Sequence, residues 1–164
     1  MPDRLRRCWD FDDLDGTEQR FRDQLDREPD DAGRAELLTQ LARVEGLRGD
    51  FDGCERLLAE AEGLAGASEI ARVRIELERG RRLRSSGEAA DSQPLFESAF
   101  ENAPANELYY LAGDAAHMVA IADPGKMIEW TERGLAVRER DPTNADAIAF
   151  AREAVETARQ ALGG

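Results

Sequence analysis

The stretch RVRIELERGRRLR, residues 72–84, carries the densest group of side chains that could do chemistry. It holds six arginines against two glutamates. If it is a helix, one face presents Arg74, Leu77, Arg81 and Arg84. Because guanidinium groups bind carboxylates through charge-assisted hydrogen bonds, this face predicts recognition of an acidic or carboxylate-bearing peptide. The alternative is that these arginines pair with nearby glutamates and aspartates and only keep the helix solvated.

The other reactive side chains do not form a catalytic or metal-binding set. His117 is the only histidine, and Cys8 and Cys54 match no zinc or redox spacing. No GxSxG, P-loop, HExxH or EF-hand pattern occurs. We therefore expect no enzyme activity, no cofactor and no metal. An enzyme hypothesis would gain support only if a closed pocket gathered Tyr110, Asp114 and His117.

The acidic stretch DFDDLDG, residues 10–16, superficially suggests a calcium loop. It lacks the full series of ligands and the closing glutamate that such a loop needs. We expect instead that Trp9, Phe11 and Leu14 pack on the first helical hairpin as an N-terminal cap. The acidic side chains can then complement the positive end of the first helix.

Composition indicates an all-helical protein that binds neither nucleic acid nor membrane. Alanine, leucine, arginine and glutamate dominate and aromatic residues make up only 6% of the chain, which favours helices. The 22 basic and 35 acidic residues give a net charge of −13, which repels nucleic acid and anionic lipid. No apolar run approaches the ~20 residues of a membrane span, and the first residues lack a secretory signal. We expect a cytoplasmic location.

Turn signals divide the chain into segments of helical length. Asp50 and Asp123 are expected to cap helices, and Pro94 either falls in a late-starting first turn or kinks its helix. The expected helices are a short one between Thr17 and Pro29, then 34–48, 51–64, 69–84, 88–102, 107–121, 124–140 and about 143–162.

The breaks between these helices recur. They fall at Gly49, Gly87 and Ala122, with spacings of 38 and 35 residues, which is typical of stacked helical hairpins. Small residues recur before and after the breaks, where two antiparallel helices must approach closely. They are Ala42, Gly80 and Ala115 on the first helices and Ala61, Ala99 and Gly134 on the second, accompanied by Cys54/Ser92/Met127 and Leu58/Phe96/Thr131.

Over residues 17–142 this pattern resembles the tetratricopeptide repeat (TPR) family, a helix–turn–helix repeat of about 34 residues. The best matching unit comprises Leu38, Leu41, Ala42, Gly49-Asp50-Phe51, Cys54, Leu58 and Ala61. The stretches WDFDD, ELLTQLARVEGL and DAAHMVAIADP also resemble uncharacterised bacterial TPR proteins. The resemblance implies a right-handed α-solenoid of antiparallel helix hairpins, with about eight helices, whose first helices line a concave groove.

The chain is expected to form one domain. Its parts are an N-terminal cap and half repeat (1–33), three repeats (34–66, 67–106 and 107–142) and a C-terminal capping helix (143–164). The last helix carries a thin apolar stripe of Ile148, Ala151, Val155, Ala158 and Leu162. That stripe covers the open end of the stack or, alternatively, pairs two copies in a homodimer.

The functional prediction is a noncatalytic protein–protein interaction module that binds a protein or peptide, most simply an acidic one, in the groove. The predicted groove residues are Arg43, Arg74, Leu77, Arg81, Arg84, Tyr109, Ala112 and Ala116, with Glu36, Thr39, Gln40 and Val119 as further candidates. The alternative function is structural homo-oligomerisation through the C-terminal helix.

Overall fold

The computed structural model describes residues 3–103 and 109–140, together with residues 149, 152, 153, 155–157, 159 and 160. Within 3–103 and 109–140 all regular secondary structure is helical, which confirms the all-α prediction. The elements are η1 (Arg6–Cys8), α1 (Leu14–Leu25), α2 (Asp31–Arg48), α3 (Phe51–Ala65), α4 (Glu69–Ser85), α5 (Ala89–Asn102), α6 (Tyr109–Ala122), η3 (Pro124–Lys126) and α7 (Met127–Arg138). Both η elements are 3-10 helices.

Side-chain caps fix where most of these helices begin. Asp30, Asp50 and Ser68 each accept a hydrogen bond from the backbone N–H three residues on, at 3.0, 2.8 and 3.2 Å. These bonds satisfy amide groups that have no partner inside the helix. Gly49 ends α2 with a φ of 83°, a left-handed conformation that favours glycine. The predicted caps Asp50 and Asp123 are both confirmed.

Several helices differ from the sequence prediction: α2 begins at Asp31 instead of residue 34, and α7 begins at Met127, after the 3-10 helix η3, instead of at residue 124. Helix α1 already begins at Leu14, because Asp13 accepts the N–H of Gly16 at 2.9 Å and turns Asp15-Gly16-Thr17 into the first helical turn. Helix α5 begins at Ala89, so Pro94 lies inside it and not in a late first turn. A proline there cannot donate the backbone hydrogen bond of its position.

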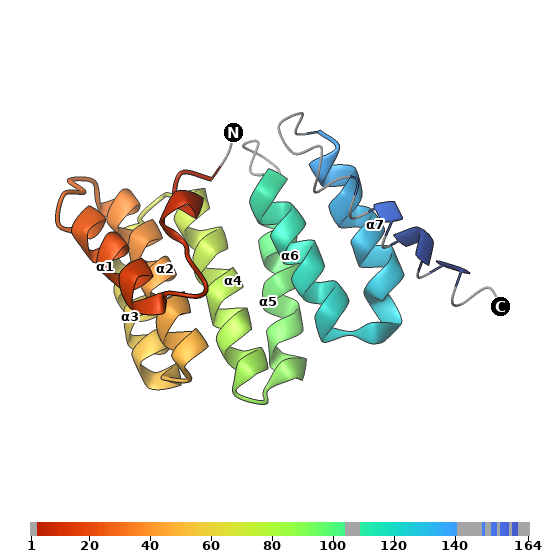
Figure 1. Ribbon diagram of the computed structural model, residues 1–164, viewed down its shortest axis with the longest axis horizontal. Helices are drawn as coiled ribbons and strands as arrows, with labels where there is room; N and C mark the ends of the chain where they lie inside the picture. The colour runs from red at the N-terminus through yellow and green to blue at the C-terminus, as the bar shows by residue number, and fades with distance from the viewer. Residues whose placement is uncertain are drawn as a thin grey trace.

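The helices pack in two layers. Each of α2, α4 and α6 contacts the helix that follows it, and α2 contacts α4 while α4 contacts α6. Helices α2, α4 and α6 therefore form one layer and α3, α5 and α7 the other, and Figure 1 shows the helices side by side from α1 to α7. Helix α1 packs on α2 at one end of the row.

Small residues lie where α2 crosses α3 and where α4 crosses α5, as predicted for Ala42 and Gly80. Ala42 and Ala115 are fully buried, and Gly80 is buried as well. A Cβ atom on Gly80 would lie 2.5 Å from a ring carbon of the buried Phe96, so no larger residue fits without moving that ring. The absence of a side chain at Gly80 therefore lets α4 and α5 approach closely.

The third pair of helices departs from the predicted register. A Cβ atom on Gly134 of α7 would lie 3.0 Å from the Cβ of Ala116, so Ala116 and not Ala115 faces Gly134 at this crossing. Met127 is 41% exposed, whereas Trp130 is only 4% exposed. The repeat pattern places Met127 and Thr131 at the positions of Cys54/Ser92 and Leu58/Phe96, but neither is buried, because Trp130 fills that space against Phe100.

The predicted helix over 143–162 falls largely outside the described residues, and so do Ile148, Ala151, Ala158 and Leu162 of its stripe. Of the stripe, Val155 is described and is 6% exposed. Ion pairs join Arg152 to Glu139 and Arg159 to Glu132, so the described residues of this segment lie against α7. Among the described residues, no helix combines the length and the apolar character that crossing a membrane requires.

Candidate functional site

The candidate site is the surface that α2, α4 and α6 present on the side away from α3, α5 and α7, here called the inner face. Its side chains recur every three or four residues along each helix, as one face of a helix requires. They are Glu36, Gln40, Arg43 and Leu47 of α2, Arg74, Glu78, Arg81 and Arg84 of α4, and Tyr110, Asp114, His117 and Ile121 of α6.

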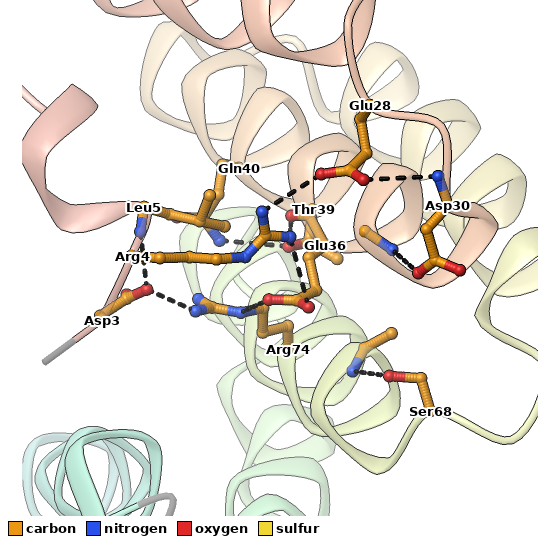
Figure 2. A network of polar contacts seen from close by, with 12 residues as sticks. Asp3, Arg4, Leu5, Glu28, Asp30, Glu36, Thr39, Gln40, Ser68 and Arg74 are labelled. Carbon is orange, nitrogen blue, oxygen red and sulfur yellow. Dashed lines mark hydrogen bonds and ion pairs between the residues drawn. The ribbon is translucent and has the colours of Figure 1, made fainter. Parts of the chain in front are cut away.

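Arg74 is a buried hub at one end of the inner face. Its guanidinium donates to Asp3 at 2.7 Å, to Glu36 at 3.3 Å and to the Tyr110 hydroxyl at 3.2 Å, and only 4% of its side chain is exposed. Burial opposes the charge, but Asp3 and Glu36 outweigh it and raise the pKa of Arg74 above its ordinary value. Figure 2 shows Arg74 between the carboxylates of Asp3 and Glu36.

A second ionic cluster lies one to two helical turns further along. Arg81 donates to Glu78 of its own helix and to Asp114 of α6, the latter at 2.6 Å. Arg43 of α2 lies 3.9 Å from the same Glu78. Burial alone would raise the pKa of Asp114, but the Arg81 guanidinium outweighs it and lowers that pKa below its usual value. These pairs tie α2, α4 and α6 together across the inner face.

The chain's own residues 3–11, here called the N-terminal segment, cover the part of the inner face around Arg74 (Figure 1). Besides the Asp3–Arg74 pair, the Trp9 indole donates to Gln40 at 2.9 Å. The rings of Trp9 and Phe11 stack at 4.9 Å, and the Arg43 guanidinium lies 5.2 and 5.5 Å from their centroids. This geometry gives a cation–π contact to both rings.

Beyond Arg43 the inner face is open. A pocket of about 220 Å³ lies there, with Arg43, Leu47, Glu78, Arg84, Met118 and Ile121 among its lining residues. Leu47 is 51% exposed and Ile121 is 39% exposed. Arg84 is also exposed and forms no ion pair with any described residue. The open part thus combines two uncovered apolar side chains with an arginine that lacks a carboxylate.

The reactive side chains do not assemble a catalytic set in the described part of the chain. Burial raises the pKa of the Cys54 thiol to about 12, with Glu78 adding to the effect, so little thiolate forms at neutral pH. Partial burial lowers the pKa of His117, with Asp114 opposing and Arg138 assisting that shift. The open pocket has neither Tyr110, Asp114 nor His117 in its lining. No group of three potential metal ligands occurs among the described residues.

The acidic residues of DFDDLDG have local roles. Asp13 caps α1, Asp15 pairs with Arg48 of α2, and Asp10 accepts the N–H of Asp12 at 3.0 Å. The predicted N-terminal cap is partly realised, since Trp9 contacts Phe21 edge-on whereas Phe11 is 60% exposed.

Seven of the eight predicted groove residues divide into three groups. Leu77, Ala112 and Ala116 are at most 1% exposed, so in this structure they belong to the core and do not line the inner face. Their placement in the groove is corrected. On α4 the inner face carries Glu78 and not the adjacent Leu77, and on α6 the residues chosen lie between the helices. Arg43, Arg74 and Arg81 do lie on the inner face but are engaged by the chain's own groups, while Arg84 is exposed and unpaired among the described residues.

The third helix of the inner face carries residues that the sequence prediction missed. Tyr110 and Asp114 contact Arg74 and Arg81 of α4, while the predicted Tyr109 lies under Arg140, whose guanidinium is 5.2 Å from its ring. Shifting the third repeat by one residue identifies Tyr110 and His117 in place of Tyr109 and Ala116. This shift follows only if Ala116, and not Ala115, is recognised as the residue where α6 crosses α7.

Comparison with known proteins adds no relative to this description. No protein-family model matches the chain, and neither a curated protein nor a solved structure matches it. Function is therefore argued from the geometry of the inner face.

Proposed function

We propose that this chain is a noncatalytic interaction module that binds a peptide segment of a protein partner on the open part of its inner face. The proposal takes the molecule as a TPR-like right-handed solenoid whose first helices α2, α4 and α6 form the binding layer. A cytoplasmic location belongs to the same proposal. A partner-binding face built on packed helices is preformed, so the receptor loses little conformational entropy on binding.

The observation that carries the proposal is the composition of the open pocket. Leu47 and Ile121 leave apolar surface uncovered on either side of it, and Arg84 presents a guanidinium without a carboxylate from the described residues. Such a site fits a peptide with an apolar side chain next to an acidic one. The whole chain carries a net charge of −13, so an acidic partner would be attracted only locally, by Arg84 and the other arginines that line the pocket, Arg43, Arg81 and Arg82.

Affinity measurements with peptides selected from a random phage-displayed library test the proposal. Selection on the full chain should enrich peptides that pair an apolar with an acidic residue. The double variant Leu47→Ser/Ile121→Ser and the variant Arg84→Glu should each bind these peptides at least about tenfold more weakly, which corresponds to about 1.4 kcal/mol.

The matched controls remove the same kinds of surface elsewhere. Met127→Ser changes an apolar residue of similar exposure at the start of α7, and Arg56→Glu changes an exposed arginine of α3. Both should bind the selected peptides like the unmodified chain. Failure to enrich any peptide, or equal binding to all variants, would contradict the proposal.

Self-association through the C-terminal helix stays a prediction, because most of its stripe lies outside the described residues. The one described stripe residue, Val155, is already buried within a single chain. That burial favours the capping interpretation of this helix over the homodimer.

A further inference from the structure

We infer that the part of the inner face under the N-terminal segment is itself a binding surface, for a peptide with a carboxylate followed by two aromatic side chains, and that residues 3–11 occupy it in the unliganded chain. The inference rests on the proposed function and deepens it, because it assigns an occupant to the other half of the same face.

The contacts of the N-terminal segment are those of a bound peptide. The Asp3 carboxylate meets Arg74 at 2.7 Å, the Trp9 N–H meets the Gln40 carbonyl oxygen at 2.9 Å, and Phe11 stacks beside Trp9 against Arg43. Three different chemical groups of the segment thus find complementary groups on α2 and α4. Recognition by a carboxylate, an N–H donor and an aromatic pair is specific. A peptide that lacked one of these groups would leave the corresponding group on α2 or α4 without a partner.

Some of the contacts that orient the inner-face side chains come from outside the segment, although Arg4 of the segment also pairs with Glu36 at 3.5 Å. Arg74 donates hydrogen bonds to Glu36 at 3.3 Å and to Tyr110 at 3.2 Å, and neither residue belongs to the segment. Gln40 donates its amide to Thr39 at 3.1 Å, which leaves its carbonyl oxygen to receive an N–H. The surface is therefore preorganised for a carboxylate and an N–H donor.

The segment itself has little regular structure that would hold it in place. Its one element is the three-residue 3-10 helix η1, and Phe11 at its end is 60% exposed. Leu5 and Cys8 are its buried anchors, in the same core cluster as Phe21 of α1. Hydrogen bonds from Arg20 to the Cys8 carbonyl oxygen and between Asp10 and Thr17 also tie the segment to α1. Segments outside packed helices nevertheless open more readily than the helices themselves, so a competing peptide meets a lower barrier here.

The inner face reaches from this surface to the open pocket without a break, because Arg43 belongs to both. Its guanidinium lies against Trp9 and Phe11 on one side and lines the pocket on the other. A partner bound in the pocket can thus place an aromatic ring where Trp9 and Phe11 meet the Arg43 guanidinium only by displacing these two rings. The N-terminal segment acts as a competitor that is tethered to the surface.

The test uses a fluorescent synthetic peptide of residues 2–13, with Cys8 replaced by serine, and measures its binding by anisotropy. A tethered segment competes at an effective concentration in the millimolar range, so the unmodified chain should bind the peptide weakly. The full-length variant Asp3→Asn/Trp9→Ala, whose own segment is weakened, should bind it at least about tenfold more tightly. Adding Arg43→Glu should remove that gain, and adding Arg56→Glu should leave it.

A peptide carrying the same Asp3→Asn and Trp9→Ala changes is the matched ligand control and should not bind. If the double variant melts cooperatively but shows no gain in affinity, the segment is a permanent part of the core and the inference is overturned. This result would leave binding in the open pocket intact, because no residue of the segment is among the residues that line the pocket.

If the double variant does not fold, hydrogen exchange on the unmodified chain tests whether a peptide can displace residues 3–11. Amides of residues 4–11 should exchange faster than those of Leu37–Val44, and saturating peptide should speed their exchange further. Equal exchange of the two regions, or no effect of the peptide, would overturn the inference.

Discussion

The two halves of the inner face are built by the same three helices but differ in how their charges are met. In the covered half Arg74 is 4% exposed and has two carboxylates and a hydroxyl around its guanidinium. In the open half Arg84 is exposed and has no carboxylate within the described residues. The N-terminal segment makes this difference, since Asp3 supplies one of the two carboxylates on Arg74.

This contrast separates arginines that the chain's own groups already engage from an arginine that has no such partner among the described residues in the unliganded chain. A buried arginine with hydrogen-bonded carboxylates belongs to the fold, because removing it leaves uncompensated charges inside the protein. An exposed arginine contributes little to the stability of the fold, and its guanidinium can bind a group of a partner. The arginine-rich stretch of the sequence contains both kinds, so neither of the two initial interpretations describes all of it.

Arg74→Ala should have the largest effect on stability. The substitution leaves Asp3 and Glu36 without their common cation in a buried site, which costs about 3–5 kcal/mol. Urea denaturation followed by circular dichroism measures this loss. A cost below about 1 kcal/mol would show that the covered half is not held by this ionic hub.

Trp9→Ala should cost about 2 kcal/mol, since Trp9 is partly buried against Phe21 and donates to Gln40. Phe11→Ala is the matched control and should cost less than about 0.5 kcal/mol, because Phe11 is 60% exposed. The same urea denaturation compares both variants. Equal costs would contradict the described docking of the segment.

Asp114→Asn should cost about 1 kcal/mol at neutral pH, because it breaks a partly exposed ion pair with Arg81. The folded-state pKa of Asp114 lies below its unfolded value of 3.8, so this stabilisation is present above pH 3.8 and is lost as the pH falls through the folded pKa. The stability difference between Asp114→Asn and the unmodified chain should therefore shrink in strong acid. A difference that stays constant with pH would exclude this charge pair as its cause.

Arg84→Ala should change stability by less than about 0.5 kcal/mol, the smallest effect of the series, because this arginine has no ion pair to lose among the described residues. Arg56→Ala on α3 is the matched control and should behave alike. Thermal melts of the two variants test this. A loss above about 1 kcal/mol for Arg84→Ala alone would assign it a structural role.

Much of the fold follows from the sequence because it depends on local signals. Asp50 and Asp123 cap helices where a short acidic side chain precedes a helical run, and Ala42 and Gly80 are buried where close approach needs small residues. These features need no knowledge of distant contacts. The all-helical class follows from them.

The inner face was predicted less well because its position depends on register. Equivalent inner-face residues are 38 apart between α2 and α4, as in Glu36 and Arg74, but 36 apart between α4 and α6, as in Arg74 and Tyr110. The break at Ala122 gives a spacing of 35, and one residue of error turns a helix face by about 100°. This rotation of the predicted face of α6 explains why Ala112 and Ala116 were assigned to the groove although they are buried.

The covering of Arg74 by Asp3 could not be predicted at all. The N-terminal segment has no helical periodicity, and its partners on α2 and α4 lie 31 and 71 residues away along the chain. Contacts of this kind depend on the assembled layer of helices, since no local pattern encodes them.

The most direct test of the inner face as the partner-binding surface is a nuclear magnetic resonance titration of the isotope-labelled full chain with a phage-selected peptide. We predict that the amide shifts change at the C-terminal ends of α2, α4 and α6, around Leu47, Arg84 and Ile121. Shift changes confined to α3, α5 and α7 would contradict the account.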